Sequence, residues 1–322
     1  MDALIAGLRA LADPTRLRLL ALCDGRELAV GELMGIVGQS QPRVSRHLKI
    51  LTAAGLLERF REGSRVYYRV RGMGPWSGVI AGLFDLLPVD ERTLSNDRER
   101  LENIRAARNE AAEAFFRDNA ADWDRLRALY VNEAEVETRL LKALRPRPEH
   151  RLLDLGTGTG RILEILAPRV SDAIGLDRSS EMLKFARAMI DRVGLANASL
   201  RQGDLYRLPF EDMAFDRIVI HQVLRYLERP AAALDEAIRV LKPGGRLVVV
   251  DFAPHAETRL ADTHRHRHLG FSDSEISEWL DRPDVVPEKP TALAGDPLTV
   301  MLWAVERIEK QSRRDKANAI HE

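Results

Sequence analysis

Apolar residues recur at helical spacing through the first part of the chain. A stripe of aliphatic residues predicts a helix over 4–11. Asp13 and Pro14 mark the start of a second helix, because aspartate accepts hydrogen bonds from free N–H groups and proline suits the first helical turn. The same spacing predicts helices over 29–37 and 41–54. The chain therefore begins with a group of short helices.

Alternating apolar and polar residues replace the helical spacing after this group. Segments 56–60 and 65–70 alternate as strands do, and the turn Glu62-Gly63-Ser64 joins them. Short helices followed by a basic two-stranded hairpin predict a winged helix-turn-helix, which is an α+β fold.

The helix predicted over 41–54 has an apolar face and a basic face. Val44, Leu48 and Leu51 share the first, and at 100° per residue Arg46 and Lys49 lie on the other. A basic helix face is often only solvated, but the neighbouring basic hairpin favours DNA binding. Such a helix presents its N-terminal side chains to base edges and nearby cations to phosphates. The predicted base-reading residues are Gln41, Arg43, Ser45 and Arg46, and the predicted phosphate contacts are Lys49, Arg61 and Arg65.

Short apolar runs alternate with helical segments in the C-terminal half. This alternation predicts βαβ units, and hence a mostly parallel sheet with helices on both faces. Ligands bind such sheets at the carboxyl ends of the strands. The predicted strands lie over about 152–155, 173–176, 198–200, 215–220, 246–252 and 299–305.

A glycine-rich turn follows the first of these strands. Gly156, Gly158 and Gly160 allow positive φ and a close approach of a ligand to bare backbone. Asp177, at the end of the next strand, is suited to accept hydrogen bonds from both hydroxyls of a ribose. The Gly-x-Gly-x-Gly spacing differs from that of dinucleotide-binding folds, so NAD is the weaker candidate.

Composition and charge narrow the setting. The 322 residues suffice for two domains, and their formal charge is zero. Residues 1–88 nevertheless hold 12 Lys and Arg against 8 Asp and Glu, which indicates a local anionic partner. The lack of a signal peptide, of a long apolar run and of a second cysteine predicts a cytoplasmic protein without a membrane partner.

The N-terminal segment resembles the ArsR/SmtB family of bacterial repressors. The resemblance rests on LADPTRLRLL at 11–20, SQPRVSRHLK at 40–49 and EGSRVYYR at 62–69. It implies binding to double-stranded operator DNA as a homodimer that pairs through 1–12 and 76–87.

The metal ligands of many members of this family are missing. The stretch that matches their cysteine pair, Glu27–Leu33, contains no cysteine. Cys23 lies outside it and is expected to be a small core residue. No metal site is therefore predicted.

The C-terminal segment resembles class I S-adenosylmethionine-dependent methyltransferases. The resemblance rests on DLGTGTG at 154–160, DRSSEM at 177–182, GD at 203–204 and LKPGG at 241–245. It implies an α/β Rossmann-like domain with a mostly parallel seven-stranded sheet. The implied ligand is S-adenosylmethionine or S-adenosylhomocysteine.

This second resemblance also implies roles for single residues. Asp154 orders the turn and approaches the amino acid moiety, Asp177 holds the ribose and Met182 packs on the adenine. Asp204 and the N–H of Leu205 bind the adenine edge. The full set expected to contact the cofactor is Asp154, Gly156, Thr157, Gly158, Gly160, Asp177, Arg178, Met182, Gly203, Asp204, Leu205, His221 and Gln222.

A charged segment almost without glycine or proline connects the two halves. Helices are predicted over 103–117 and 133–144, and the aromatic residues between 115 and 130 are expected to cap the ligand site. The expected parts of the chain are an ArsR-type domain over 1–88, a helical connector and cap over 89–143, a methyltransferase-like domain over 144–308 and a charged tail over 309–322.

Two functions are compatible with this combination. One is a DNA-binding transcriptional regulator with S-adenosylmethionine or S-adenosylhomocysteine as effector. The alternative is an active methyltransferase that modifies a small molecule and carries a DNA-binding and dimerisation domain. The sequence favours the regulator, because the DNA-reading residues are intact while only His221 is apparent as a candidate base for methyl transfer.

Overall fold

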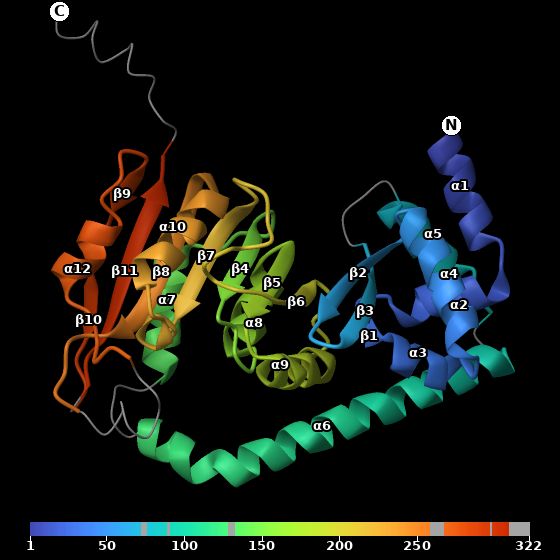
Figure 1. Ribbon diagram of the computed structural model, residues 1–322, viewed down its shortest axis with the longest axis horizontal. Coiled ribbons are helices and arrows are strands. Elements are labelled where there is room, and N and C mark those ends of the chain that lie inside the picture. Colours follow the sequence, from blue (N-terminus) through green and yellow to red (C-terminus); the bar gives the residue numbers. More distant parts are fainter. Residues whose placement is uncertain (72–75, 89–90, 128–132, 258–266, 297, 309–322) are drawn as a thin grey trace, which may run out of the picture. The chain divides into compact units, whose positions relative to one another are not determined.

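The computed structural model describes residues 1–71, 76–88, 91–127, 133–257, 267–296 and 298–308 (Figure 1). Contacts divide the chain into two compact units. The first comprises Met1–Asp118, Gly158–Glu164 and Ser179–Gln202, and the second comprises Asn119–Thr157, Ile165–Arg178 and Gly203–Glu322. These units group residues by contact, whereas the domain boundaries given above follow the sequence and stay predictions.

The first unit contains the predicted winged helix-turn-helix. The Asp13 carboxylate accepts a hydrogen bond from the N–H of Arg16 and so caps the second helix. Gly38, at φ 68°, ends the third helix in the left-handed conformation that suits glycine. The elements are α1 (Asp2–Leu11), α2 (Pro14–Leu22), β1 (Leu28–Ala29), α3 (Val30–Val37), α4 (Gln41–Ala53), β2 (Leu57–Glu62), β3 (Arg65–Val70) and α5 (Ser77–Asp85).

The apolar face predicted for α4 is confirmed. Val44, Leu48 and Leu51 are fully buried and pack in one cluster with Leu19 and Leu33. Burying such a side chain stabilises a fold by about 1.5–3 kcal/mol. This face therefore orients α4 and leaves its basic face outward. Strands β2 and β3 form an antiparallel hairpin, and the short strand β1, which the sequence did not predict, pairs with β3.

The connector contains a longer helix than predicted. Helix α6 runs over Arg92–Arg127 and α7 over Glu133–Leu144. The extension beyond 103–117 has a simple cause, because no glycine or proline interrupts the chain between residues 89 and 145. The aromatic side chains proposed as a cap, between 115 and 130, are not among the side chains that the structure describes.

The second unit contains the predicted mostly parallel sheet. Its strands run in the order β10-β11-β8-β7-β4-β5, with β9 beside β11. Strand β4 is parallel to β5 and to β7, and β7 is parallel to β8. Strand β11 is antiparallel to β8. The strands are β4 (Arg151–Leu155), β5 (Asp172–Asp177), β7 (Phe215–His221), β8 (Leu241–Phe252), β9 (Val285–Pro287), β10 (Thr291–Leu293) and β11 (Val300–Arg307).

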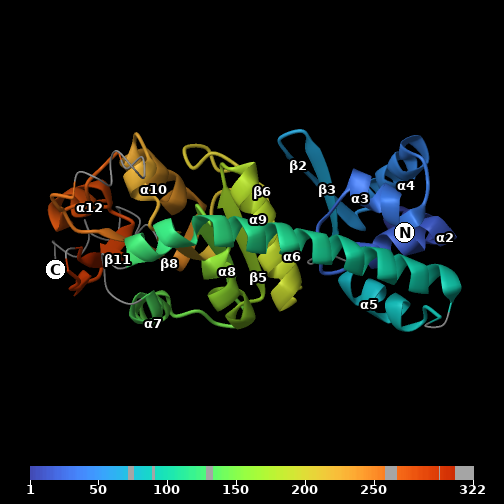
Figure 2. The same cartoon turned by 90° about the horizontal axis from the view of Figure 1, so that it is seen from below.

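Helices cover both faces of this sheet. Figure 2 shows α7 on one face and α10 (Pro230–Val240) on the other, where α12 (Asp273–Trp279) also lies. The short strands β9 and β10 were not predicted, since three residues are too few for a periodic signal. Helix α8 (Arg161–Leu166) is divided between the units, and α9 (Ser180–Val193) and strand β6 (Ala198–Gln202) belong to the first unit. The described residues also form two short 3₁₀ turns, at Ala167–Arg169 and Leu224–Tyr226. Among the described residues, no helix has the length and apolarity needed to cross a membrane.

Candidate cofactor site and DNA-binding surface

A buried carboxylate lies at the carboxyl end of β4. Asp154 is only 1% exposed. Its Oδ2 accepts a hydrogen bond of 2.6 Å from the Thr157 hydroxyl. Its Oδ1 is buried and has no hydrogen-bond partner in the described part of the chain. Burial raises the pKa of Asp154 to about 7. An unsatisfied buried acceptor is costly, so this oxygen is a place where a cationic ligand group would be stabilised.

The glycine turn beside Asp154 leaves no room for side chains. Gly156 has φ 77°, and a Cβ there would lie 2.4 Å from a methyl carbon of Val223. The N–H groups of Gly156 and Thr157 both donate to the carbonyl of Leu176 on β5, at 2.7 and 3.0 Å. The start of the turn is therefore fixed to the neighbouring strand.

The later part of the turn belongs to the first unit and is also closely packed. Gly160 has φ 91°, and a Cβ there would lie 2.5 Å from Cε of Met189 and 3.2 Å from Cβ of Ala186 on α9. Glycine is therefore required at positions 156 and 160, both by the backbone conformation and by the lack of space for a side chain.

Two further acids predicted to bind the ligand follow β5 and β6. Asp177 ends β5, and its carbonyl accepts a hydrogen bond from the N–H of Gly203. The exposed Asp204 carboxylate accepts a hydrogen bond of 3.0 Å from the N–H of Tyr206. The Asp204 carboxylate thus stabilises its own turn. The proposed hydrogen bond from the adenine would share this carboxylate with the N–H of Tyr206.

His221 and Gln222 lie at the carboxyl end of β7. Removal from water and the nearby Arg225 lower the pKa of His221 to about 4, so its imidazole is neutral at pH 7. Gln222 has φ 58°, its N–H donates to Val250, and its Oε1 accepts a hydrogen bond from Arg225. A glutamine in the left-handed region is uncommon, and such strain clusters at functional sites.

A buried ion pair supports this end of the sheet and was not predicted. Arg225 and Asp251 are both almost fully buried, with Nη1 and Oδ1 3.0 Å apart. The Arg225 guanidinium also lies over the ring of Phe252, 4.5 Å from its centroid. The available signal was a single acid, Asp251, at the end of the apolar run in β8, and the sequence alone does not indicate its partner.

The structure brings most predicted cofactor residues to one edge of the second unit. Strands β5, β4 and β7 are adjacent and parallel, so their carboxyl ends carry Asp177, Asp154 and His221 at the same edge. The predicted contacts in this unit are Asp154, Gly156, Thr157, Asp177, Arg178, Gly203, Asp204, Leu205, His221 and Gln222, and those in the first unit are Gly158, Gly160 and Met182.

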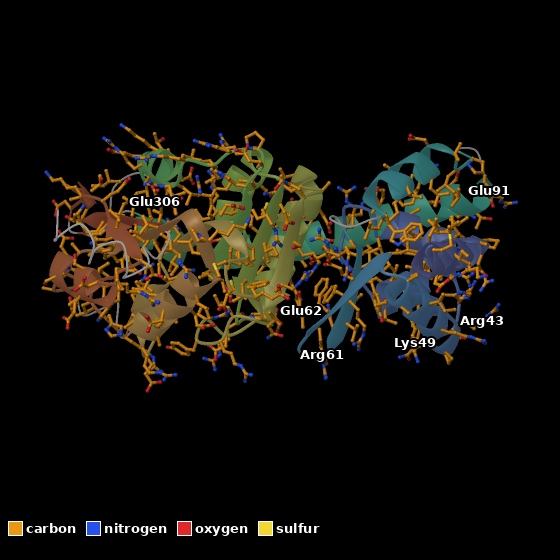
Figure 3. The ribbon with its side chains drawn as sticks, turned by 90° about the horizontal axis from the view of Figure 1, so that it is seen from above. Arg43, Lys49, Arg61, Glu62, Glu91 and Glu306 are labelled. Carbon is orange, nitrogen blue, oxygen red and sulfur yellow. The ribbon has the colours of Figure 1, made fainter. Side chains whose placement is uncertain are left out.

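The predicted DNA-reading side chains lie on the outer face of α4. Gln41, Arg43, Arg46 and Lys49 are exposed and Ser45 is half-buried. Figure 3 shows Arg43, Lys49 and Arg61 projecting from the same side of the first unit.

The hairpin carries the other two predicted phosphate contacts. Arg61 and Arg65 are exposed, and Arg61 Nε donates to the carbonyl of Gly63 at 2.8 Å. Within the described residues, neither Arg43 nor Lys49 takes part in an ion pair, so both cations remain available to an anionic partner.

Two segments of the sequence match known families. Residues 146–282 match the family described as a methyltransferase domain, and residues 13–59 match the family of bacterial regulatory proteins of the arsR type. The chain is 38% identical to a demethylmenaquinone methyltransferase of Thermus thermophilus over 199 residues, which cover 59% of this chain and 90% of that protein. It is 33% identical to the uncharacterized methyltransferase YcgJ of Bacillus subtilis, covering 44% of this chain and 57% of the relative, so only about half of some relatives is matched.

The structure of the second relative, YcgJ, has been solved. The crystal structure of YcgJ covers 55% of this chain with a TM-score of 0.48 and 22% identity. Together the sequence matches define a two-part protein, with an ArsR-family helix-turn-helix and a methyltransferase domain. Through its C-terminal domain the chain belongs to the S-adenosylmethionine-dependent methyltransferases. Both of these relatives are named as methyltransferases, which favours the enzyme alternative over the regulator that the sequence pattern favoured.

Proposed function

We propose that this protein is an S-adenosylmethionine-dependent methyltransferase that acts on a small molecule and also binds DNA through its N-terminal domain. The observation that carries the first part is the buried Oδ1 of Asp154, which lacks a partner in the described chain beside a glycine turn too tight for side chains. The ligand's α-amino group is a cation of the size and charge that this oxygen requires.

Other residues would hold the rest of the cofactor. Asp177 would accept hydrogen bonds from the ribose hydroxyls, Met182 would pack on the adenine, and Asp204 with the N–H of Leu205 would bind its edge. The cofactor supplies an electrophilic methyl group on a sulfonium. The protein's own contribution is to orient it and to exclude water from the edge formed by β4, β5 and β7.

His221 would act as a neutral hydrogen-bonding group. A base whose conjugate acid has a pKa of about 4 removes a proton poorly from an acceptor at pH 7. An acceptor that ionises readily by itself, such as a phenol or a quinol, fits this site better than an alcohol does.

Calorimetry and a turnover assay test this function. Wild-type protein is expected to bind S-adenosylmethionine, and Asp177→Ala is expected to weaken binding about 10- to 100-fold, since two charge-assisted hydrogen bonds are lost. The exposed Asp296→Ala is the matched control. Acceptor-dependent formation of S-adenosylhomocysteine should appear with a quinol or phenol in a metabolite panel. Binding without turnover on any acceptor would leave the second candidate.

The second candidate is the regulator, in which the bound ligand changes DNA affinity. It is favoured by the exposed cations of α4, which have the placement that DNA reading requires. Fluorescence anisotropy with a duplex from the region upstream of its own gene, with and without saturating S-adenosylhomocysteine, tests it. An unchanged dissociation constant would exclude this candidate.

The N-terminal domain is proposed to dimerise through 1–12 and 76–87. Helix α1 exposes Leu4, Ile5 and Leu8, and α5 exposes Val79. Within the chain these segments already pack together, since a Cβ on Gly7 would overlap the ring of Trp76 at 1.8 Å. A second copy would cover the remaining apolar surface.

A further inference from the structure

One face of the hairpin β2–β3, called the wing here, is covered by α9 and β6 within the first unit. Strand pairing places Glu58, Phe60 and Glu62 of β2 on this face, and the partner of Phe60 on β3 is Tyr67. The rings of Phe60 and Tyr67 stack at 5.8 Å. Arg59 and Arg61 lie on the opposite face and are exposed. The wing therefore has a covered face and a free basic face.

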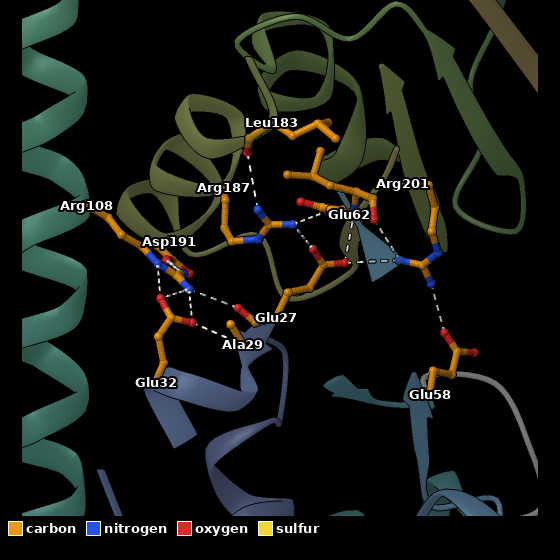
Figure 4. Close-up of polar contacts among 11 residues, drawn as sticks. Glu27, Ala29, Glu32, Glu58, Glu62, Arg108, Leu183, Arg187, Asp191 and Arg201 are labelled. Atoms are coloured by element: carbon orange, nitrogen blue, oxygen red, sulfur yellow. Dashed lines mark hydrogen bonds and ion pairs between the residues drawn. The ribbon is translucent and has the colours of Figure 1, made fainter. Parts of the chain in front are cut away.

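Arg187 of α9 is the centre of this contact (Figure 4). Its side chain is 3% exposed, and Nη2 lies 2.9 Å from Glu27 Oε2 and 2.5 Å from Glu62 Oε1. Its guanidinium also lies over the ring of Tyr67, 3.9 Å from the centroid. We call Arg187, Glu27, Glu62 and Tyr67 the wing latch.

Strand β6 supports the latch on its other side. Arg201 lies over the ring of Phe60 at 3.9 Å and pairs with Glu58 at 3.0 Å and Glu27 at 3.2 Å. At the tip of the wing, the N–H of Gly63 donates to the side-chain oxygen of Gln202 at 2.6 Å. Polar contacts thus follow the wing from its base to its tip.

The far end of α9 is tied to the helix-turn-helix as well. Arg108 of α6 pairs with Asp191 at 2.5 Å and with Glu32 of α3 at 2.8 Å. Glu32 in turn accepts a hydrogen bond from the N–H of Ala29, the residue directly before α3. Helix α9 is therefore held to both α3 and the wing.

The latch depends on the charge of Arg187. Glu62 is 4% exposed, and burial raises its pKa while Arg187 favours its charged form. Removing one partner of a buried ion pair leaves an uncompensated charge, which is strongly destabilising for that arrangement. Without Arg187, the Glu62 carboxylate would move towards water. Because Glu62 lies on β2, the wing would be displaced as well.

The latch lies close to the ligand-binding segment along the chain. Helix α9 begins directly after Asp177-Arg178-Ser179, and Met182 precedes Arg187 by little more than one helical turn. A helix transmits a displacement of its first turn to its second. We propose that α9 couples the cofactor segment to the wing through the latch, so that occupancy of the cofactor site changes how the wing engages DNA. This inference rests on the proposed binding of S-adenosylmethionine or S-adenosylhomocysteine.

The whole 322-residue chain allows a direct test with Arg187→Gln. The matched control is Arg192→Gln, because Arg192 also lies on α9 but is exposed. S-adenosylhomocysteine affinity is measured by calorimetry and DNA affinity by anisotropy, with and without S-adenosylhomocysteine. Hydrogen exchange of the amides at 61–66 reports on the wing itself. For the wild type and the control we expect saturating ligand to change DNA affinity at least fivefold, as allosteric couplings usually do.

Arg187→Gln should bind S-adenosylhomocysteine within twofold of the wild type. Its wing amides should exchange faster, and its DNA affinity should change less than twofold with ligand. A purely structural joint would alter stability without removing the ligand response. Glu62→Gln, which retains the pair of Arg187 with Glu27, should give the same change to a smaller extent and serves if Arg187→Gln does not fold.

The outcomes separate this inference from the proposed function. A full ligand response in Arg187→Gln or, should that variant not fold, in Glu62→Gln, or a wild type that binds S-adenosylhomocysteine without any change in DNA affinity, would overturn the latch alone. A wild type that binds neither S-adenosylmethionine nor S-adenosylhomocysteine would overturn the proposed function, and the latch with it.

Discussion

Asp154 shows how one residue can be costly to the fold and useful to the site. Its carboxyl group is buried with one oxygen unpartnered in the described chain, and its pKa is raised to about 7. Its ordinary pKa is about 3.9, so the unfolded chain releases this proton at lower pH than the folded chain does. Stability contributed at this residue therefore falls as pH rises from about 4 to about 7, and bound ligand would offset the loss.

We accordingly expect Asp154→Asn to stabilise the ligand-free protein at pH 8 by about 1–4 kcal/mol, because asparagine carries no buried charge. The difference should shrink as pH falls towards about 3, below the ordinary aspartate pKa of about 3.9, where wild-type Asp154 is protonated in both states. Urea unfolding followed by circular dichroism measures it, with the exposed Asp296→Asn as control. The same variant should bind S-adenosylmethionine at least tenfold more weakly. If Asp154→Asn destabilised the protein equally at high and at low pH, the proposed cost of the buried Asp154 charge would be contradicted.

At the scale of elements, helix α4 separates stability from function by its two faces. Val44, Leu48 and Leu51 hold it in the core, while Arg46 and Lys49 are exposed. Changes on the exposed face should therefore affect DNA binding without unfolding the domain.

For Arg46→Ala we expect DNA binding to weaken by about 1–3 kcal/mol with relaxed sequence preference, as for loss of a base contact. Lys49→Ala should weaken binding to all sequences and reduce the salt slope by about 1, as for loss of a phosphate contact. Anisotropy titrations between about 50 and 200 mM salt would distinguish the two variants. Arg192→Ala, on α9, is the control, and a melting temperature lowered by either α4 variant would argue for a structural role instead.

At the scale of the whole molecule, the winged helix and part of the methyltransferase fold share one compact unit. Residues of α9 and β6 group by contact with the N-terminal residues. The ion pairs of Arg187 with Glu27 and Glu62 join positions 160 and 125 residues apart. Apolar surface remains exposed on α1 of the N-terminal domain, where Leu8 is 52% exposed.

Leu8→Glu is expected to convert the proposed dimer to a monomer, because a charge at the centre of an apolar interface is left without a partner. DNA affinity should fall at least tenfold, since two half-sites are no longer bound together, while S-adenosylmethionine binding stays unchanged. Sedimentation velocity measures the association state. Val286→Glu, on the exposed strand β9, is the control, and a wild type that sediments as a monomer would refute the dimer.

The sequence by itself determined the features that depend on neighbouring residues. Helical spacing and the Asp13 cap predict α2, alternation predicts the wing, and the glycines at 156–160 predict a turn against a ligand. These signals are local, so one sequence suffices to read them. Short strands such as β9 and β10 and the full length of α6 gave no periodic signal that could be read in this way.

Only the tertiary structure decided which polar groups meet. The two carboxylates at Arg187, the pairing of Arg225 with Asp251 and the unpartnered oxygen of Asp154 depend on contacts between distant elements or on burial by them. A charged residue in a sequence carries no record of its partner, because ion pairing follows from the positions that packing assigns. The motifs therefore identify the two families from local pattern, whereas the physical link between the wing and α9 exists only in the folded chain.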